Sequence, residues 1–216
     1  HDALPISAAA IARGFGIECD VHKSADGTPM VFHDDSLERL TGQPGRLADR
    51  TAAQLGVTRL LGSADTVPTL RELLDLVADR VPLLIELKAP EDGRIGALCL
   101  AVRRVLEGYR GPHAVMSFDA RIARWFLLHS PHTIRGLVVS EQDDKALTGR
   151  LRRHRMLWHA KPDFLSYDIR DLPGRFPRGQ RERGLPIATW TVRTADQLER
   201  AQDHADAPTV EGAGVP

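Results

Sequence analysis

The chain has 216 residues, 42% of them hydrophobic, so it is long enough to bury one sizeable core. Basic and acidic residues balance at 29 each, which excludes a global field that would attract nucleic acid or an anionic membrane. No apolar run approaches the roughly 18 residues of a membrane span. We therefore expect a single domain over residues 1–216, with no nucleic-acid partner and no stable membrane insertion.

The two cysteines, Cys19 and Cys99, form neither a disulfide pattern nor a metal-binding pattern. Free thiols suit a reducing compartment, so we expect a cytoplasmic protein. The sequence gives no indication of the oligomeric state.

The first residues, HDALPIS (1–7), resemble the translated end of a common sequencing-library adapter. We expect these residues to be non-native and the natural sequence to begin near Ala8. The alternative is an ordinary lead-in to a helix over residues 8–13, with Pro5 near the helix start. Under either interpretation a signal peptide is not readable from this chain.

From Ala8 onward, short apolar runs alternate with segments of helical periodicity. Strands are predicted over residues 16–21, 81–88, 113–118, 134–140, 163–168, 185–192 and 207–212. Helices are predicted over residues 70–79, 94–107, 120–128, 143–154 and 194–204, several of them behind Asp, Ser or Thr as a cap. Strands and helices that alternate at this spacing predict a parallel sheet.

Seven strands in one alternating series favour an α/β fold of the TIM (β/α)8 barrel type, with one strand unaccounted for. An open doubly wound sheet is the alternative, but it would tend to show a glycine-rich first turn, and the sequence has none. We expect the missing first strand to precede Ala8.

Polar residues interrupt two of the predicted strands. Glu18 and Asp20 are two residues apart, so they point to the same face of their strand, and Glu86 and Lys88 repeat this spacing on the next parallel strand. In a barrel the carboxyl ends of the strands carry the chemistry. Three carboxylates that converge there would repel one another without a cation, and carboxylate oxygens favour Ca²⁺ or Mg²⁺ over zinc. The sequence therefore predicts a divalent metal held by Glu18, Asp20 and Glu86.

His33 is the candidate catalytic histidine. Asp26 and Gly27 form a favoured two-residue hairpin turn, and a hairpin closed there places His33 opposite Asp20. A longer loop over residues 24–29 is the alternative, and it would change this register. A lone histidine after a short edge strand is usually a surface residue, but the neighbouring acidic pairs favour catalysis.

Together these segments resemble glycerophosphodiester phosphodiesterases, in order and over nearly all of the chain after Ala8. The matching segments are GIECDVHKSADGTPMVFHDDSLERLTG (16–42), VPTLRELLDLV (67–77), LLIELK (83–88), VMSF (115–118) and IATWTV (187–192). The resemblance implies a TIM barrel with a small insertion between its second and third strands, at about residues 22–80 here. It also implies hydrolysis of glycerophosphodiesters to glycerol 3-phosphate and an alcohol.

The resemblance assigns roles to individual residues. It makes Lys88 the cation beside the phosphate, Trp190 the aromatic residue that lines the substrate pocket, and His33 the histidine of the family's His-Asp element. Its metal ligands correspond to Glu18, Asp20 and Glu86. Glu211 stands where an aspartate is common in the family, and this leaves its role open.

One departure from the family concerns its first strand, which ends in a His-Arg-Gly motif. No such motif precedes Gly14, and His1 cannot substitute because Asp-Ala follows it. We expect a family member that lacks its first strand and is impaired for that reason, since His33 supplies only one of the two proton transfers.

Two other functions stay open at this point. One is a different metal-dependent phospholipid-cleaving TIM-barrel phosphodiesterase, and the other is a non-catalytic fragment that binds metal and phosphate. A basic run at Arg150–Arg155 could bind lipid headgroups or nucleic acid, but a solvated helix face is the expectation in a neutral chain. The sequence predicts neither the alcohol group of the substrate nor the preferred divalent metal.

Overall fold

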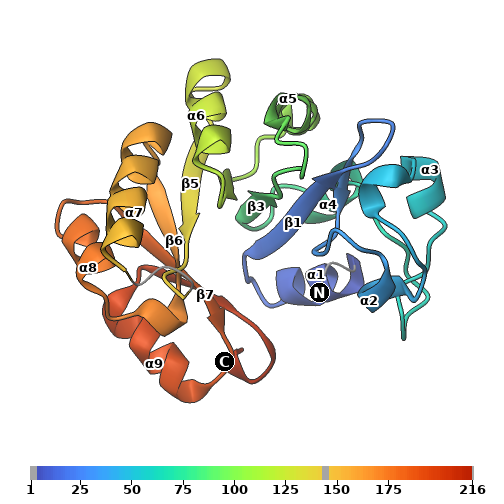
Figure 1. Ribbon diagram of the computed structural model, residues 1–216. Coiled ribbons are helices and arrows are strands. Elements are labelled where there is room, and N and C mark those ends of the chain that lie inside the picture. Colours follow the sequence, from blue (N-terminus) through green and yellow to red (C-terminus); the bar gives the residue numbers. More distant parts are fainter. Residues whose placement is uncertain (1–3, 143–145, 216) are drawn as a thin grey trace. The chain divides into compact units, whose positions relative to one another are not determined.

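The computed structural model describes residues 4–142 and 146–215, in two units that comprise residues 1–115 and 116–216 (Figure 1). In the first unit the hydrogen-bonded strand order is β2-β1-β3-β4. These strands are β1 (Ile17–Lys23), β2 (Pro29–Val31), β3 (Leu83–Leu87) and β4 (His113–Ser117), the last of which contains the unit boundary. β1 runs parallel to β3 and antiparallel to β2.

The pairing of β1 with β3 separates polar from apolar side chains. Asp20 lies opposite Glu86 in the register. Cys19, Val21 and Ile85, which alternate with the acidic residues, are at most 2% exposed. Because neighbouring residues of a strand point to opposite faces, one face of this strand pair packs in the core while the other presents the charged residues.

The hairpin between β1 and β2 differs from its prediction. His22 pairs with Met30, and the backbone N–H of Phe32 donates to the carbonyl of Asp20 at 2.9 Å, so His33 does not lie opposite Asp20. The hairpin closes between Ser24 and Thr28 around three residues rather than two. The Ser24 hydroxyl, which lies 2.9 Å from the Thr28 N–H, stabilises this longer loop. The expected register is therefore wrong by one residue.

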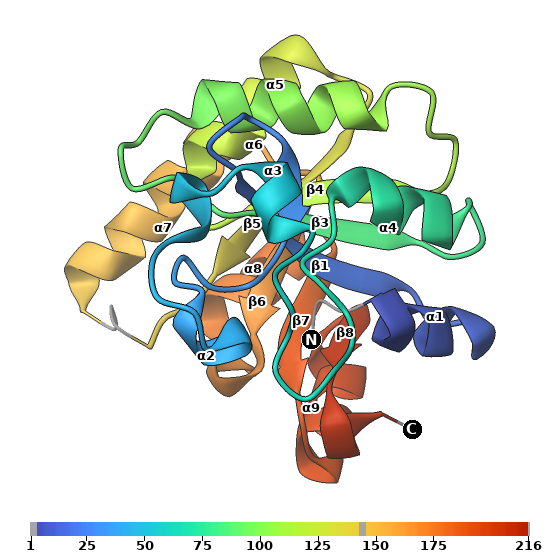
Figure 2. The ribbon, with the colours of Figure 1, turned by 90° about the vertical axis from the view of Figure 1, so that its right-hand side faces the viewer.

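The segment between β1 and β3 has a core of its own. It contains β2, the 3-10 helix η1 (Leu47–Asp49) and the helices α2 (Glu38–Thr41), α3 (Ala52–Leu55) and α4 (Leu70–Val77) (Figure 2). Its buried side chains are all at most 2% exposed and comprise Met30, Phe32, Leu37, Leu47, Leu55 and Val67. α4 begins with a capping box between Thr69 and Glu72 and ends at Val77, two residues before its predicted end. The assignment of residues 22–80 as an insertion stays a prediction.

Two further helices belong to the first unit. α1 (Leu4–Ala12) packs against α4 and β1, and it ends before Gly14, whose φ of 76° suits glycine. α5 (Ile95–Leu106) matches the predicted helix to within one residue at each end.

The second unit alternates strands and helices as predicted. Its strands are β5 (Ile134–Val139), β6 (Phe164–Asp168), β7 (Ile187–Val192) and β8 (Ala207–Val210), and neighbours in this order pair in parallel. Its helices are α6 (Ala120–His129), α7 (Leu147–Ala160), α8 (Arg175–Arg181) and α9 (Ala195–His204), with 3-10 helices η2 (Ile169–Asp171) and η3 (Gly212–Gly214). Its core is built from side chains such as Leu137, Leu165, Tyr167 and Ile187.

Two helices of this unit differ from what the sequence predicts. α8 was not predicted, because its sequence contains Pro177 and Gly179. The helix predicted over residues 143–154 begins instead at Leu147 and runs to Ala160, and residues 143–145 lie outside the described part of the chain. Across residues 4–142 and 146–215, every helix is too short or too polar for a membrane crossing.

Candidate active site

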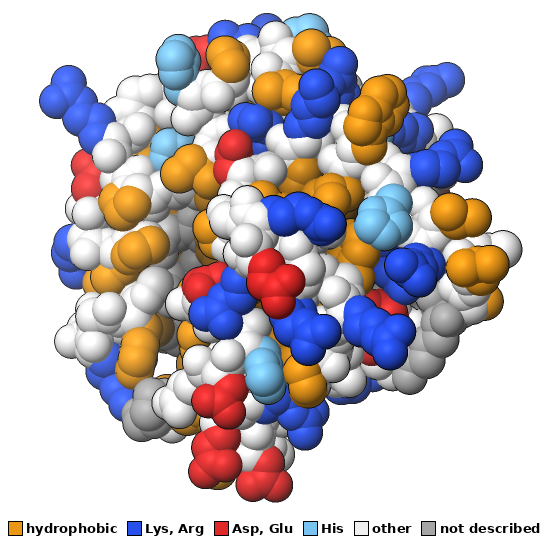
Figure 3. Space-filling view, turned by 90° about the vertical axis from the view of Figure 1, so that its left-hand side faces the viewer, with side chains coloured by type: hydrophobic (Ala, Val, Ile, Leu, Met, Phe, Trp, Pro, Cys, Tyr) orange, Lys and Arg blue, Asp and Glu red, His pale blue; other side chains and the backbone are white. Residues whose placement is uncertain are grey.

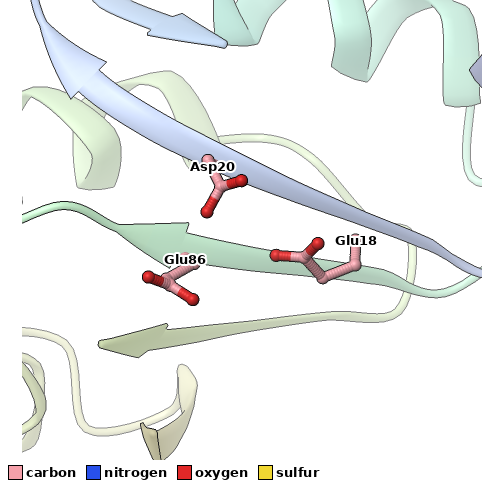
Figure 4. A group of neighbouring side chains, drawn as sticks. All are labelled: Glu18, Asp20 and Glu86. Atoms are coloured by element: carbon pink, nitrogen blue, oxygen red, sulfur yellow. The ribbon is translucent and has the colours of Figure 1, made fainter. Parts of the chain in front are cut away.

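Three carboxylates converge on the polar face of β1 and β3 (Figure 4). One oxygen from each of Glu18, Asp20 and Glu86 lies within 4.8 Å of the others. Asp20 and Glu86 are 6% and 7% exposed, and Glu18 is half-buried. The backbone explains this convergence, because Asp20 and Glu86 face each other in the register and Glu18 lies two residues back on the same face.

Lys88, which follows β3, reaches into this acidic cluster. Its Nζ lies 2.7 Å from Asp20 Oδ1 and 2.5 Å from Glu86 Oε1. Burial by itself would lower the pKa of Lys88, but the charges of Glu86 and Asp20 outweigh burial and raise it. Burial raises the pKa of Glu86, and Lys88 opposes this effect. Lys88 is thus protonated at neutral pH and offsets part of the cluster's negative charge.

The donor set of the acidic cluster fits a hard divalent cation. Glu18, Asp20 and Glu86 offer only carboxylate oxygens, which are the ligands that Ca²⁺ and Mg²⁺ prefer. Three carboxylates and one ammonium leave an excess of negative charge when all are ionised. That excess is the electrostatic condition for binding a cation.

His33 lies after β2 and is held by a pair of charged residues. Its Nδ1 is 2.6 Å from Asp34 Oδ1, and Arg39 of α2 donates two hydrogen bonds to Asp34, at 2.6 and 2.7 Å. The hydrogen bonds from Arg39 lower the pKa of Asp34 to about 2. His33 is exposed, and its charge lowers the pKa of Glu86, so the imidazole lies within electrostatic reach of the acidic cluster.

His22 is a site residue that was not predicted from the sequence. This residue is 7% exposed and shares a strand face with Glu18 and Asp20. Its Nε2 donates to the backbone carbonyl of His33 at 3.2 Å, and its Nδ1 lies 3.4 Å from Asp35 Oδ1. Burial lowers the pKa of His22. The alternation of Glu, Asp and His at residues 18, 20 and 22 was the available signal.

Trp190 and Glu211 lie in the second unit. The Trp190 Nε1–H donates to the Ser166 carbonyl at 3.1 Å, and its ring meets Phe118 edge-to-face at 5.6 Å. Glu211 forms an ion pair with Arg193 at 2.8 Å. The substrate-binding role of Trp190 stays a prediction, and the role of Glu211 stays open.

The parallel strands β1 and β3 carry a carboxylate cluster, with a lysine and a histidine beside it. Together with the alternating β/α units, this cluster defines an α/β protein with a candidate metal centre for phosphoryl chemistry. A family model described as "Glycerophosphoryl diester phosphodiesterase family" matches residues 3–209, and the chain belongs to that family. The resemblance drawn from the sequence motifs is therefore confirmed.

Curated relatives agree with the family match. Glycerophosphodiester phosphodiesterase 1 of Rattus norvegicus is 30% identical over 94% of this chain and 72% of its own length. A glycerophosphodiester phosphodiesterase of Bacillus altitudinis is 35% identical over a shorter stretch, 34% of this chain and 32% of that protein.

Solved structures establish the fold. A phosphodiesterase of Oleispira antarctica in complex with the product sn-glycerol-3-phosphate has a TM-score of 0.82 at 23% identity, over 96% of this chain and 86% of that one. A glycerophosphodiester phosphodiesterase of Thermotoga maritima has a TM-score of 0.75 at 23% identity, over 97% of this chain and 88% of that one. The predicted TIM-barrel class is confirmed.

Proposed function

We propose that the chain hydrolyses glycerophosphodiesters to glycerol 3-phosphate and an alcohol, with a divalent cation, Ca²⁺ or Mg²⁺, as cofactor. The observation that carries this proposal is the acidic cluster with Lys88 on one face of β1 and β3, within electrostatic reach of His33. The rat relative is named for this activity, and the Oleispira antarctica structure contains this product.

Glu18, Asp20 and Glu86 would hold the cation. When bound, it supplies positive charge that polarises a phosphoryl oxygen and offsets developing negative charge. Lys88 contributes a second, fixed positive charge, because its raised pKa keeps it protonated at neutral pH. An ammonium fixed in place before the reaction stabilises the transition state without a reorganisation step.

His33 is the proposed proton-transfer group. An imidazole nitrogen can either carry a proton or accept one, so His33 can donate a proton to a leaving alkoxide or accept one from a nucleophile. Asp34 accepts the hydrogen bond from Nδ1, which fixes the tautomer and leaves Nε2 as the nitrogen that exchanges the proton. Arg39 holds Asp34 in the ionised state that this role needs.

The 216-residue chain is proposed to have a low turnover rate. Its 216 residues contain no His-Arg-Gly run, so the family's second histidine and its arginine have no counterpart in this sequence. Loss of one general acid or base typically costs about 10²–10⁴-fold in rate. A version extended at its amino end by a strand that ends in His-Arg-Gly should be faster by about this factor.

The test measures glycerol 3-phosphate released from glycerophosphocholine, with Ca²⁺ or Mg²⁺, by the chain and by its extended version. Glu86→Gln should lose both turnover and cation binding by calorimetry, whereas His33→Gln should lose turnover and keep cation binding. The controls are Glu38→Gln and His204→Gln, one an exposed glutamate of α2 and the other an exposed histidine of α9.

Three results would contradict the proposal. Unchanged turnover in His33→Gln would remove the catalytic role of His33, and unchanged cation binding in Glu86→Gln would remove the metal site. Cation binding without turnover of several glycerophosphodiesters by the folded, extended version would count against the substrate class.

A further inference from the structure

Helix α7 has an unusual composition for a helix on the surface of a globular unit. Its sequence, LTGRLRRHRMLWHA, contains four arginines, two histidines and no acidic residue. Gly149, Arg153 and Ala160 form its buried side, and Arg153 binds Glu141 at 2.9 Å. These residues fix which side of α7 faces away from the second unit.

Large apolar side chains occupy that outward side. Leu147, Leu151 and Trp158 are 72%, 60% and 77% exposed. With 3.6 residues per turn, spacings of four and seven residues place the three in one row along the helix. Single exposed apolar residues are common on protein surfaces, whereas three on one side of a helix make that side a candidate interaction surface.

Arginines flank this row. Arg150 and Arg155 are exposed and lie on opposite sides of the line through Leu147, Leu151 and Trp158, again by helical spacing. Figure 3 shows the face of the second unit that carries α7, where hydrophobic and basic side chains are interspersed. We call these five residues the α7 outer face.

We propose that the α7 outer face adsorbs to the surface of an anionic lipid bilayer. An amphipathic helix that lies in the plane of a membrane buries Leu and Trp at the boundary between headgroups and acyl chains, while its arginines meet the lipid phosphates. On the α7 outer face the apolar residues are central, with the exposed His154 between Leu151 and Trp158, and arginines lie on both sides. A polynucleotide would use the arginines but leave the apolar row in water.

The neutral net charge of the chain is compatible with this surface. Charges are screened beyond about 10 Å at 0.1 M salt, so only groups near the bilayer contribute to adsorption. The helix that would touch the bilayer is basic throughout, with no acidic residue to oppose binding. The attraction is therefore local, and high salt should weaken it. This proposal does not depend on the proposed hydrolytic activity.

The test is co-sedimentation of the full chain with vesicles of phosphatidylcholine, with and without phosphatidylglycerol. We expect binding only to the phosphatidylglycerol vesicles, weakened by salt. Arg150→Gln and Arg155→Gln should each weaken it about fivefold, and Trp158→Ser about tenfold. Leu61→Ser and Arg94→Gln are matched controls in the first unit, since Leu61 is 63% exposed and the Arg94 side chain 88% exposed.

Circular dichroism establishes that each variant is folded. Absence of vesicle binding at low salt, or equal binding by Trp158→Ser and the parent, would overturn the proposal. A dimer seen by analytical ultracentrifugation and lost in Trp158→Ser would identify a second copy of the chain as the occupant instead. Tighter binding to duplex DNA than to the anionic vesicles would also refute it.

Discussion

Replacement of Lys88 by methionine removes an ammonium that contacts two buried carboxylates. Lys88 Nζ lies 2.7 Å from Asp20 and 2.5 Å from Glu86, whose side chains are each 9% exposed. Removal of one partner from a buried ion pair costs about 3–5 kcal/mol, because the remaining charge is uncompensated. Against a typical stability of about 5–15 kcal/mol, Lys88→Met should be strongly destabilised in the absence of divalent cations.

A divalent cation should reverse much of this loss. The carboxylates that Lys88 contacts are those proposed to bind the cation, so the variant offers a more negative site. At 100 times its dissociation constant a ligand stabilises the folded state by about 2.7 kcal/mol. Calcium should therefore raise the free energy of unfolding more in Lys88→Met than in the parent.

Urea unfolding in EDTA and in excess Ca²⁺ measures both effects. The matched control is Lys23→Met, because the Lys23 ammonium contacts only the Ser24 carbonyl, at 3.4 Å, among its described polar contacts. A loss below about 1 kcal/mol in EDTA, or the same calcium response in parent and variant, would refute the reasoning about buried charge.

Other predictions concern single contacts, each measured by urea unfolding. The pKa of the Asp34 carboxyl is about 2 in the folded chain and 3.8 in the unfolded chain. The ionised carboxylate therefore stabilises the folded state above pH 4, and this stabilisation is lost as the pH falls to 2. Asp34→Asn should thus be less stable than the parent at pH 6 but equal to it near pH 2; a gap independent of pH would contradict this. Thr69→Ala should cost about 1 kcal/mol through the lost cap of α4, and no measurable loss would contradict it. Gly136→Ala should cost about 1–3 kcal/mol because its Cβ would meet the Phe164 ring, and Phe164→Ala should relieve the clash. Additive losses in the double variant would argue against it.

The strands were predictable because their side chains follow a simple rule. Alternation predicts Glu18 and Asp20 on one face of their strand and Glu86 and Lys88 on one face of theirs, and the register of β1 and β3 brings the three carboxylates together. The sequence did not predict where Lys88 would point. Its ammonium contacts the carboxylates. Burial and local charge determine this orientation, and strand periodicity carries no information about either.

The hairpin register failed for a local reason. Asp-Gly usually marks a two-residue turn, but here Gly27, at a φ of 89°, ends a three-residue loop that hydrogen bonds of Ser24 stabilise. Because the loop has one more residue, Phe32 rather than His33 lies opposite Asp20, and His22 pairs with Met30. Such a competition between turn types is decided by a few hydrogen bonds, so the sequence pattern alone does not settle it.

Two different parts of the first unit position the residues of the candidate site. The carboxylates are fixed by strand pairing, whereas His33 is oriented through Asp34 by Arg39, which lies on α2 beside the buried Leu37. If the proposed roles hold, substitutions near Arg39 in the small core between β1 and β3 should affect proton transfer by His33 more than cation binding by the carboxylates. Exchange of residues 36–67 as one segment is therefore expected to change turnover more than cation affinity, if the proposed function is correct.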